Sequence, residues 1–260
     1  MADPVADPGY ETPGKLELIW GEGFMSPGGP AEVARIVGGR PLDGCEVLDI
    51  GCGLGGADIA LVVTHGAASV TGIDVQAELI EGASHRVARQ GLSERIRFVQ
   101  IVPGPLPFAN ESFDVVFSKD ALLHVADKAA IYREAFRVLR PGGRLMVSDW
   151  LRGQGDGIDG IVDDFVAAAG HAFHMVTLPQ ISAHVAAAGF TEVETEDRGM
   201  WYLGEAKEEL ERLGGALGDR FADQFGAQAL ADETEFWRVL VRALDARAMS
   251  PGHIRATKPG

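Results

Sequence analysis

The sequence predicts an α/β protein built on a doubly wound, Rossmann-like sheet. Short apolar runs rich in valine and isoleucine alternate with longer segments of helical periodicity, which is typical of parallel strands joined by helices. The run at 47–50 passes directly into the glycine-rich turn GCGLGG, as expected where a buried strand ends and a helix begins. The chain has 260 residues and is 46% hydrophobic, so it can bury a full core as one large domain or as a domain with a lid.

The elements of the first half follow from apolar spacing and from the turn residues between them. Residues 1–14 are acidic and proline-rich and predict an N-terminal arm, the apolar segment at 16–24 predicts a helix, and SPGGP at 26–30 predicts a turn. After this turn we expect helices over 31–37, 57–65, 76–90 and 128–140, and strands over 47–50, 68–73, 96–102, 113–120 and 143–150.

The second half is richer in glycine, alanine and charged residues. Helical spacing in DDFVAAAGHAF and ISAHVAAAG predicts helices that cap the sheet between 153 and 189. The segment 191–203 has strand character, the charged stretch 205–249 predicts a pair of helices, and HIRATK at 253–258 alternates like a final edge strand.

The glycine-rich turn and an acid about twenty positions later indicate a nucleotide-cofactor crevice. Asp74 ends the second apolar run, where a carboxylate can accept hydrogen bonds from ribose hydroxyls. Gly51 and Gly53 allow the backbone to approach a ligand closely, and the following helix offers free N–H groups. The loop is not GxGxxG followed by a small residue, and Asp49 precedes it inside the strand. These two features favour S-adenosylmethionine (SAM) over a dinucleotide. Asp49 either orders the loop or contacts the methionine ammonium.

The charge balance limits the classes of partner. The chain carries 23 basic and 38 acidic residues, for a net charge of −15, which repels nucleic acid and anionic membranes and favours a cationic small molecule. Two cysteines are too few for a disulfide framework. No apolar stretch is long enough for a membrane helix, and the first residues do not resemble a signal peptide. We therefore expect a cytoplasmic protein.

Several motifs taken together resemble a class I SAM-dependent methyltransferase. They are VLDIGCGLGG, GIDV, the block SFDVVFSKDALLHVADKAAIYREAFRVLRPGGRLMVSDW and the terminal HIRATK. Within that class, WGEGFMSPGG at 20–29 together with SKDALLHV is similar to the phosphoethanolamine N-methyltransferase family. The resemblance implies a seven-stranded sheet whose last strand inserts antiparallel. It also suggests a division into an N-terminal arm and active-site closing segment (1–30), a SAM-binding core (31–152), a helical lid (153–190), and C-terminal strands and helices that complete the sheet (191–260).

The resemblance also implies a set of cofactor contacts. Met25 and Ser26 would close over the methionine end of SAM, and Val75 follows Asp74 in the GIDV motif. The family usually carries an acid for the adenine amino group, where this chain has Val102 and Pro103. Adenine must then be held by backbone groups, by apolar packing or by a water. Lys119 and Asp120 end the fourth strand, where open α/β sheets bind ligands, and we assign Lys119 to the cofactor and Asp120 to the acceptor.

His124 is the expected proton acceptor. A single histidine in ALLHV is by default a structural residue, but the resemblance implies catalysis. Methyl transfer requires an aligned lone pair on a deprotonated nitrogen, and a histidine titrating near neutrality can take that proton. The resemblance pairs it with a tyrosine of the N-terminal arm, and Tyr10 is the tyrosine present there, although the arm could equally be disordered.

The acceptor end departs from the family. Ala167, His171, Phe173 and Leu240 stand where the resemblance would place the tyrosines and basic residues of a phosphate clamp. An amine without phosphate therefore fits better than phosphoethanolamine. Aromatic side chains could face a methylated ammonium through cation–π contacts, or they could simply be core and lid packing. These aromatic candidates are Trp20, Trp150, Phe173, Trp201 and Tyr202.

Other readings remain open. His171 and His174 could ligate a metal, but no third ligand is apparent and methyl transfer needs none, so we expect no metal site. The acceptor nucleophile could be a carboxylate, hydroxyl or thiol, or a phosphate clamp could be rebuilt from Arg152, Arg198 or Arg242. A SAM-binding module without turnover is a further alternative, against which the retained His124 argues. We therefore predict a small-molecule N-methyltransferase.

Overall fold

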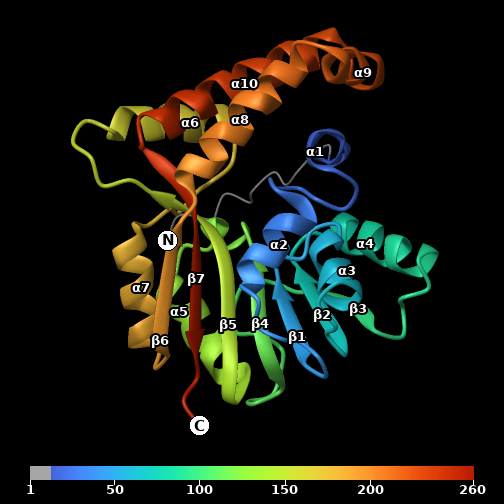
Figure 1. Ribbon diagram of the computed structural model, residues 1–260, viewed down its shortest axis with the longest axis vertical. Coiled ribbons are helices and arrows are strands. Elements are labelled where there is room, and N and C mark those ends of the chain that lie inside the picture. The colour runs from blue at the N-terminus through green and yellow to red at the C-terminus, as the bar shows by residue number, and fades with distance from the viewer. Residues whose placement is uncertain (1–12) are drawn as a thin grey trace.

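A single seven-stranded sheet forms the centre of the protein, as a computed structural model of residues 13–260 shows (Figure 1). Its strand order is β3-β2-β1-β4-β5-β7-β6, with β1 to β5 parallel and β7 antiparallel to both β5 and β6. The predicted doubly wound sheet with an antiparallel last strand is confirmed. The strands are β1 Glu46–Ile50, β2 Ser69–Asp74, β3 Ile96–Gln100, β4 Phe113–Lys119, β5 Leu139–Arg152, β6 Thr191–Asp197 and β7 Met249–Thr257.

Helices cover both faces of the sheet and its carboxyl-terminal end. Apolar side chains of α2, α3 and α4 pack on one face, and those of α5 and α7 pack on the other. Helices α6, α8, α9 and α10 lie above the carboxyl ends of the parallel strands, with α1 below α9 (Figure 1). The helices are α1 Pro13–Trp20, α2 Gly29–Val37, α3 Gly56–Val63, α4 Ala77–Arg89, η1 Leu122–His124 (a 3₁₀ turn), α5 Lys128–Val138, α6 Asp159–Ala169, α7 Leu178–Ala187, α8 Gly199–Leu213, α9 Ala216–Phe225 and α10 Ala227–Asp245.

The C-terminal strand differs from its expected place. HIRATK alternates as an edge strand would, but β7 lies inside the sheet between β5 and β6, and β6 is the edge. The polar members of the alternation, His253 and Arg255, are buried. Hydrogen bonds replace the water they lose, because Glu32 pairs with His253, and the Ile36 carbonyl accepts from Arg255.

Two further expectations for the second half need correction. The segment 191–203 is strand only as far as Asp197, because α8 begins at Gly199, whose N–H donates to the Asp197 carboxylate. The charged stretch that follows holds three helices rather than two, because glycines at 214, 215 and 226 break it. Of the two helices expected to cap the sheet, α6 packs against α10, whereas α7 lies beside α5 and β6. None of the described helices combines the length and apolar character needed to cross a membrane.

A buried ion-pair network fixes the start of α2. Glu32 accepts hydrogen bonds from Arg198 at 2.8 and 3.0 Å and contacts His253 at 2.8 Å. Burial alone would raise the pKa of Glu32, but the hydrogen bonds from His253 and Arg198 outweigh it and lower the pKa to about 2. The Arg198 guanidinium also lies 4.3 Å from the ring centroid of Trp201. Since α2 follows the segment 20–29, these contacts hold that segment against the sheet.

Candidate active site

The glycine-rich loop leaves β1 and folds against the end of β2. The Gly51 and Cys52 N–H groups both donate to the Ile73 carbonyl, at 2.8 and 3.1 Å. Gly51 has φ of +78°, and a Cβ built on it would lie 2.1 Å from the Ala121 Cβ. Only glycine therefore allows this loop to pass so close to the chain that follows β4.

Asp74 holds the same loop from the other side. Its carboxylate accepts from the Gly53 N–H at 3.1 Å and from the Gln76 N–H at 3.0 Å. Burial raises the pKa of Asp74, and these backbone hydrogen bonds oppose the rise. Asp74 is half-buried at the carboxyl end of β2, so its carboxylate both shapes the loop and lies at the crevice where the resemblance places a ribose.

Asp49 is a buried residue of β1 that is not the hydrogen-bond partner of the first three N–H groups of the loop. The loop N–H groups of Gly51, Cys52 and Gly53 donate to Ile73 and Asp74 instead, and Oδ1 of Asp49 is buried without a hydrogen-bond partner. Burial, together with the nearby Asp58 carboxylate, raises the pKa of Asp49 well above its ordinary value. Sequence reasoning missed Asp58, although an acid in the otherwise apolar helix GADIALVV was a signal. A cation bound beside this acidic pair would be stabilised.

Two exposed valines flank the crevice. Val75 follows β2 with 47% of its surface exposed, and Val102 follows β3 with 80% exposed. Strands β2 and β3 are adjacent, with Asp74 paired to Gln100. Val102 and Pro103 follow β3, at the point where the resemblance would place an acid. Apolar surface of this kind suits the faces of a planar base. Together with Asp74 and the buried Asp49 oxygen, it fits a nucleoside carrying a cationic amino acid, as SAM does.

A lysine connects the end of β4 to the segment that precedes α2. Lys119 Nζ donates to Ser26 Oγ at 2.5 Å, to the Pro27 carbonyl at 2.9 Å and to Asp120 at 2.9 Å. The Sδ atom of Met25 lies 3.3 Å from where a Cβ on Gly53 would stand. Met25 and Ser26 are thus brought over the glycine loop, and Lys119 is the cation that holds them there.

Asp120 has a strained backbone. Its φ of +55° is unusual for a residue other than glycine. The side chain is held by Ser148, whose Oγ donates to Oδ1 at 2.7 Å, and by Lys119. Backbone strain of this kind persists where surrounding contacts hold the residue in place. Here the contacts with Ser148 and Lys119 hold the Asp120 carboxylate at the edge of a cavity.

His124 lies on the short turn η1, which two buried charged residues hold in place. Asp149 accepts from the Leu123 N–H at 2.8 Å, and Lys128 donates to the Leu122 carbonyl and lies 3.5 Å from Asp149. Burial raises the pKa of Asp149 to about 7 and lowers that of Lys128, although each partner's charge opposes the shift of the other. Tyr10, the expected partner of His124, lies outside the described residues.

The loop after α6 packs on this turn. The His124 ring centroid lies 5.2 Å from that of Phe173 and 6.0 Å from that of His171. These residues lie beyond α6, which ends at Ala169, so the helix expected to carry His171 and His174 stops before them. Among residues 13–260, no three His, Cys, Asp or Glu side chains cluster as metal ligands would.

A cavity of about 460 Å³ opens between this loop, the lid helices and α1. Eight of the residues expected at the site line it, whereas His124 and Lys119 are not part of the lining and contact lining residues, His124 through Phe173 and Lys119 through Ser26. Sequence reasoning missed Phe165 and Phe236, because an apolar residue at helical spacing gives no sign of whether it faces core or cavity. The expected residues that line the cavity are Trp20, Met25, Ser26, Asp120, Trp150, His171, Phe173 and Tyr202.

One buried acid organises part of the cavity wall. Glu209 accepts hydrogen bonds from Trp20 at 2.7 Å and from Tyr202 and Trp237 at 3.2 Å each. Burial raises the pKa of Glu209 to about 7, and the three donors oppose the rise. Glu209 was also missed, since in the sequence EAKEELERL it looks like one more residue of a solvated helix face.

Comparison with known proteins agrees with this geometry. A family model described as a methyltransferase domain matches residues 41–206. Phosphoethanolamine N-methyltransferase 1 of Arabidopsis thaliana is 31% identical over 232 residues, which are 88% of this chain and 46% of that protein. The 27-O-demethylrifamycin SV methyltransferase of Amycolatopsis mediterranei is 33% identical over 165 residues, which are 63% of this chain and 60% of that protein.

A solved structure extends the likeness to almost the whole chain. Phosphoethanolamine N-methyltransferase 2 of Haemonchus contortus, in complex with phosphomonomethylethanolamine and S-adenosylhomocysteine, matches with a TM-score of 0.87 and 25% identity. The match covers 95% of this chain and 57% of that one. The same enzyme has also been solved with SAM. The chain spans about half the length of the curated phosphoethanolamine methyltransferases that it matches.

Proposed function

The chain belongs to the methyltransferase domain family, and we propose that it uses SAM to methylate a small-molecule amine that lacks a phosphate group. The observation that carries the proposal is the charge of the acceptor cavity. Its lining includes three carboxylates, Asp120, Asp232 and Glu233, and Lys15 is the one lysine or arginine among the described lining residues. Lys119 pairs with Asp120 at 2.9 Å, but Asp232 and Glu233 still outnumber Lys15, and such a surface favours a cation and opposes a phosphate dianion.

The arginines that could rebuild a phosphate clamp are occupied elsewhere. Arg198 is bound to Glu32, Arg242 pairs with Asp164 at 3.0 Å, and Arg152 pairs with Asp159. None of the three arginines lines the cavity. Of the four positions where the resemblance would place clamp residues, Leu240 and Phe173 are apolar lining residues, Ala167 lies outside the lining, and only His171 brings a polar side chain to the cavity.

Each site residue then has a role in holding or deprotonating a reactant. Asp74 binds the ribose, Val75, Val102 and Pro103 pack on adenine, and Asp49 faces the methionine end, over which Met25 and Ser26 close. SAM supplies a methyl group on a sulfonium, and the amine lone pair forms the new N–C bond while the S–C bond breaks and sulfur keeps its electron pair. His124 accepts the proton that the nitrogen loses, and Tyr10, in the arm before α1, would assist it.

We place the domain boundaries by function as follows. Residues 1–30 close the site and residues 31–152 bind the cofactor. The lid within 153–190 is limited to α6, which acts together with α8, α9 and α10 over the acceptor. Strands β6 and β7 complete the sheet.

A hydroxyl acceptor is the second candidate. The rifamycin relative is named as an O-methyltransferase, and the cavity does not by itself exclude an alcohol. His124 could deprotonate a hydroxyl as it would an ammonium. The acidic lining favours the amine, because a neutral alcohol can hydrogen-bond to a carboxylate but lacks the charge–charge attraction of an ammonium.

The test is a side-by-side assay with SAM. Ethanolamine and its mono- and dimethyl forms are compared with phosphoethanolamine and its mono- and dimethyl forms, and methylated product is measured by mass spectrometry. We expect higher kcat/KM for the amines without phosphate. Faster turnover of the phosphorylated series would overturn the proposal on phosphate, and methylation restricted to alcohols would favour the second candidate.

A further inference from the structure

We infer that the acceptor amine is attached to a bulky apolar body, comparable in size to a drug-like molecule, rather than to a two-carbon alcohol. The inference rests on the proposed N-methyltransferase function and names the substrate class for its cavity. Three features carry it, namely the volume of the cavity, its aromatic walls and the need to align the amine.

The cavity is too large for a two-carbon amine. At about 460 Å³, it has room for about fifteen water molecules and falls within the range of pockets that bind drug-sized ligands. Gly51, Gly53 and Asp74 are not part of its lining, so this space lies outside the part of the crevice that faces the ribose, and it meets the methionine end of the cofactor only at Met25 and Ser26. Ethanolamine would leave most of it filled with water.

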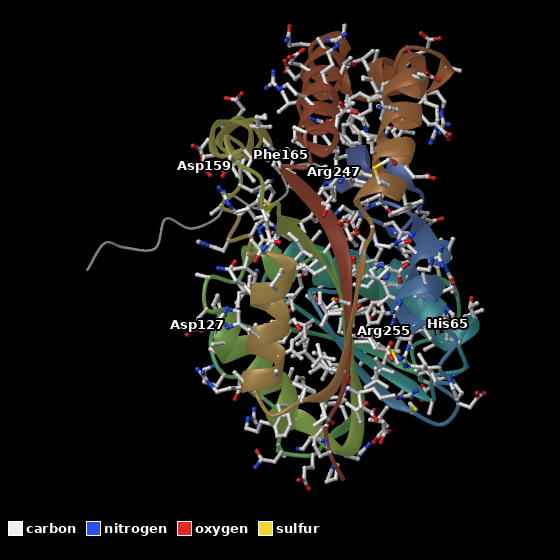
Figure 2. The ribbon with its side chains drawn as sticks, turned by 60° about the vertical axis from the view of Figure 1, so that its left-hand side comes forward. His65, Asp127, Asp159, Phe165, Arg247 and Arg255 are labelled. Atoms are coloured by element: carbon white, nitrogen blue, oxygen red, sulfur yellow. The ribbon has the colours of Figure 1, made fainter. Side chains whose placement is uncertain are left out.

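The walls are aromatic, and their rings are packed against one another. Phe165 of α6 stacks on Phe173 with centroids 5.8 Å apart and on Trp150 at 6.3 Å, and it meets Phe236 at 5.7 Å. Figure 2 labels Phe165 where α6 adjoins the C-terminal helices. Trp150 in turn meets Tyr202 edge to face at 5.3 Å. Phe165, Trp150 and Tyr202 are themselves almost fully buried and support the wall. The half-buried rings of Trp20, Phe173 and Phe236 offer the apolar surface from which an apolar body would displace water.

Catalysis also requires such a body. Methyl transfer gains its rate from holding the nitrogen in line with the methyl group. A two-carbon amine touching one end of a wide cavity would sample many orientations, and the single carboxylate of Asp120 cannot fix them all. An apolar body that fills the space between α6 and α10 would hold the nitrogen in one position. Its binding energy would then be used for alignment.

A series of unphosphorylated primary amines tests the inference. Ethanolamine, 2-phenylethylamine and 2-(4-biphenylyl)ethylamine increase in apolar size, and spermidine serves as a long but polar control. We expect kcat/KM to rise along the series by about tenfold or more from first to last, and spermidine to react no better than ethanolamine. Quenching of tryptophan fluorescence by the biphenyl amine, in the presence of S-adenosylhomocysteine, would report its binding independently of turnover.

Two substitutions on the same helix make the test specific to the cavity. Ala169 lines the cavity, whereas Ala167 is exposed and lies outside the lining. Ala169→Trp should lower kcat/KM for the biphenyl amine by about tenfold or more, as overpacking does, and should spare ethanolamine. Ala167→Trp should change neither.

The outcomes distinguish a failure of this inference from a failure of the proposed function on which it rests. Ethanolamine reacting as well as the biphenyl amine, or equal loss of both in Ala169→Trp, would overturn the inference and leave the N-methyltransferase intact. Failure of every amine with SAM, while an alcohol is methylated, would overturn both.

Discussion

The indole Nε1 of Trp20 donates a 2.7 Å hydrogen bond to the buried carboxylate of Glu209, 189 positions further along the chain. Trp237 and Tyr202 donate to the same carboxylate. The last residue of α1 is thereby joined to α8 and α10. Because Trp20 also lines the cavity, the segment that we propose closes over the cofactor and the helices that we propose cover the acceptor share one hydrogen-bonded acid.

The first prediction is that Glu209 makes stability depend on pH. Burial raises the pKa of Glu209 from 4.5 to about 7, so below pH 4.5 the group is protonated in both states and has no effect on stability. As the pH rises toward 7, the unfolded state ionises first, and the folded state becomes less stable by about 3 kcal/mol on account of this group. Glu209→Gln should lose this part of the pH dependence.

Chemical denaturation at several pH values between 4.5 and 8 measures the effect. The pKa values of Asp149 and Asp58 are also raised to about 7, so the native protein titrates there for more than one reason, and only the difference between native protein and variant reports Glu209. Glu208→Gln, at an exposed neighbour on α8, is the control and should keep the native dependence. Parallel curves for the native protein and Glu209→Gln would contradict the prediction.

The second prediction concerns the cofactor. Asp74→Ala removes a carboxylate that both faces the crevice and holds the N–H groups of Gly53 and Gln76. Loss of hydrogen bonds to a charged group should weaken SAM binding by about 1.5–3 kcal/mol. Calorimetry on the folded variant measures this, with Glu78→Ala on α4 as an exposed acidic control. Unchanged affinity would remove Asp74 from the site.

The third prediction concerns the proton acceptor. His124→Ala should lower turnover by about 10²–10⁴, the range for general-base catalysis, and should leave SAM affinity nearly unchanged. The exposed His85 on α4 provides the control, and His85→Ala should keep full turnover. If His124→Ala turns over the acceptor at close to the native rate, the residue is structural.

A fourth prediction tests the support of the His124 turn. Lys128→Met would leave Asp149 buried without its cation and should cost about 3–5 kcal/mol of stability at pH 8, where Asp149 is ionised. Adding Asp149→Asn should restore part of the loss, because no buried charge then remains. Denaturant titration of the single and double variants measures both, and Arg133→Met on the exposed face of α5 should be nearly neutral. A single variant as stable as the native protein would show that the pair does not hold the turn.

The sequence predicted the strands up to β5 and the glycine loop well, because their signals are local. A buried parallel strand followed by glycines and a later Asp74 has few other interpretations. The inner position of β7 could not be predicted in this way. His253 and Arg255 alternate with apolar residues as exposed side chains would, but Glu32 and the carbonyls of Arg35 and Ile36, more than 200 positions away, are among the partners that make their burial possible.

The cavity was harder still to predict. Trp20 and Trp150 were expected at the acceptor because of their chemistry. Phe165, Phe236 and Glu209 reach the cavity wall through the way the helices pack on one another, which no local sequence pattern indicates. The same side chain in a helix can face core, cavity or solvent depending on how α6, α8 and α10 cross. Residue type alone therefore predicted more of the cavity lining that comes from segment 20–26 and the strand ends than of the lining that comes from the lid helices.

The place of β7 also sets an order of events during synthesis. Strand β6 pairs with β7 and with no other strand, so residues 191–197 have no partner in the sheet until 249–257 leave the ribosome. Until then β5 is the open edge, with its N–H and C=O groups available to other chains. A ribosome stalled between 200 and 245 would expose that edge, and chaperone demand should peak over this interval.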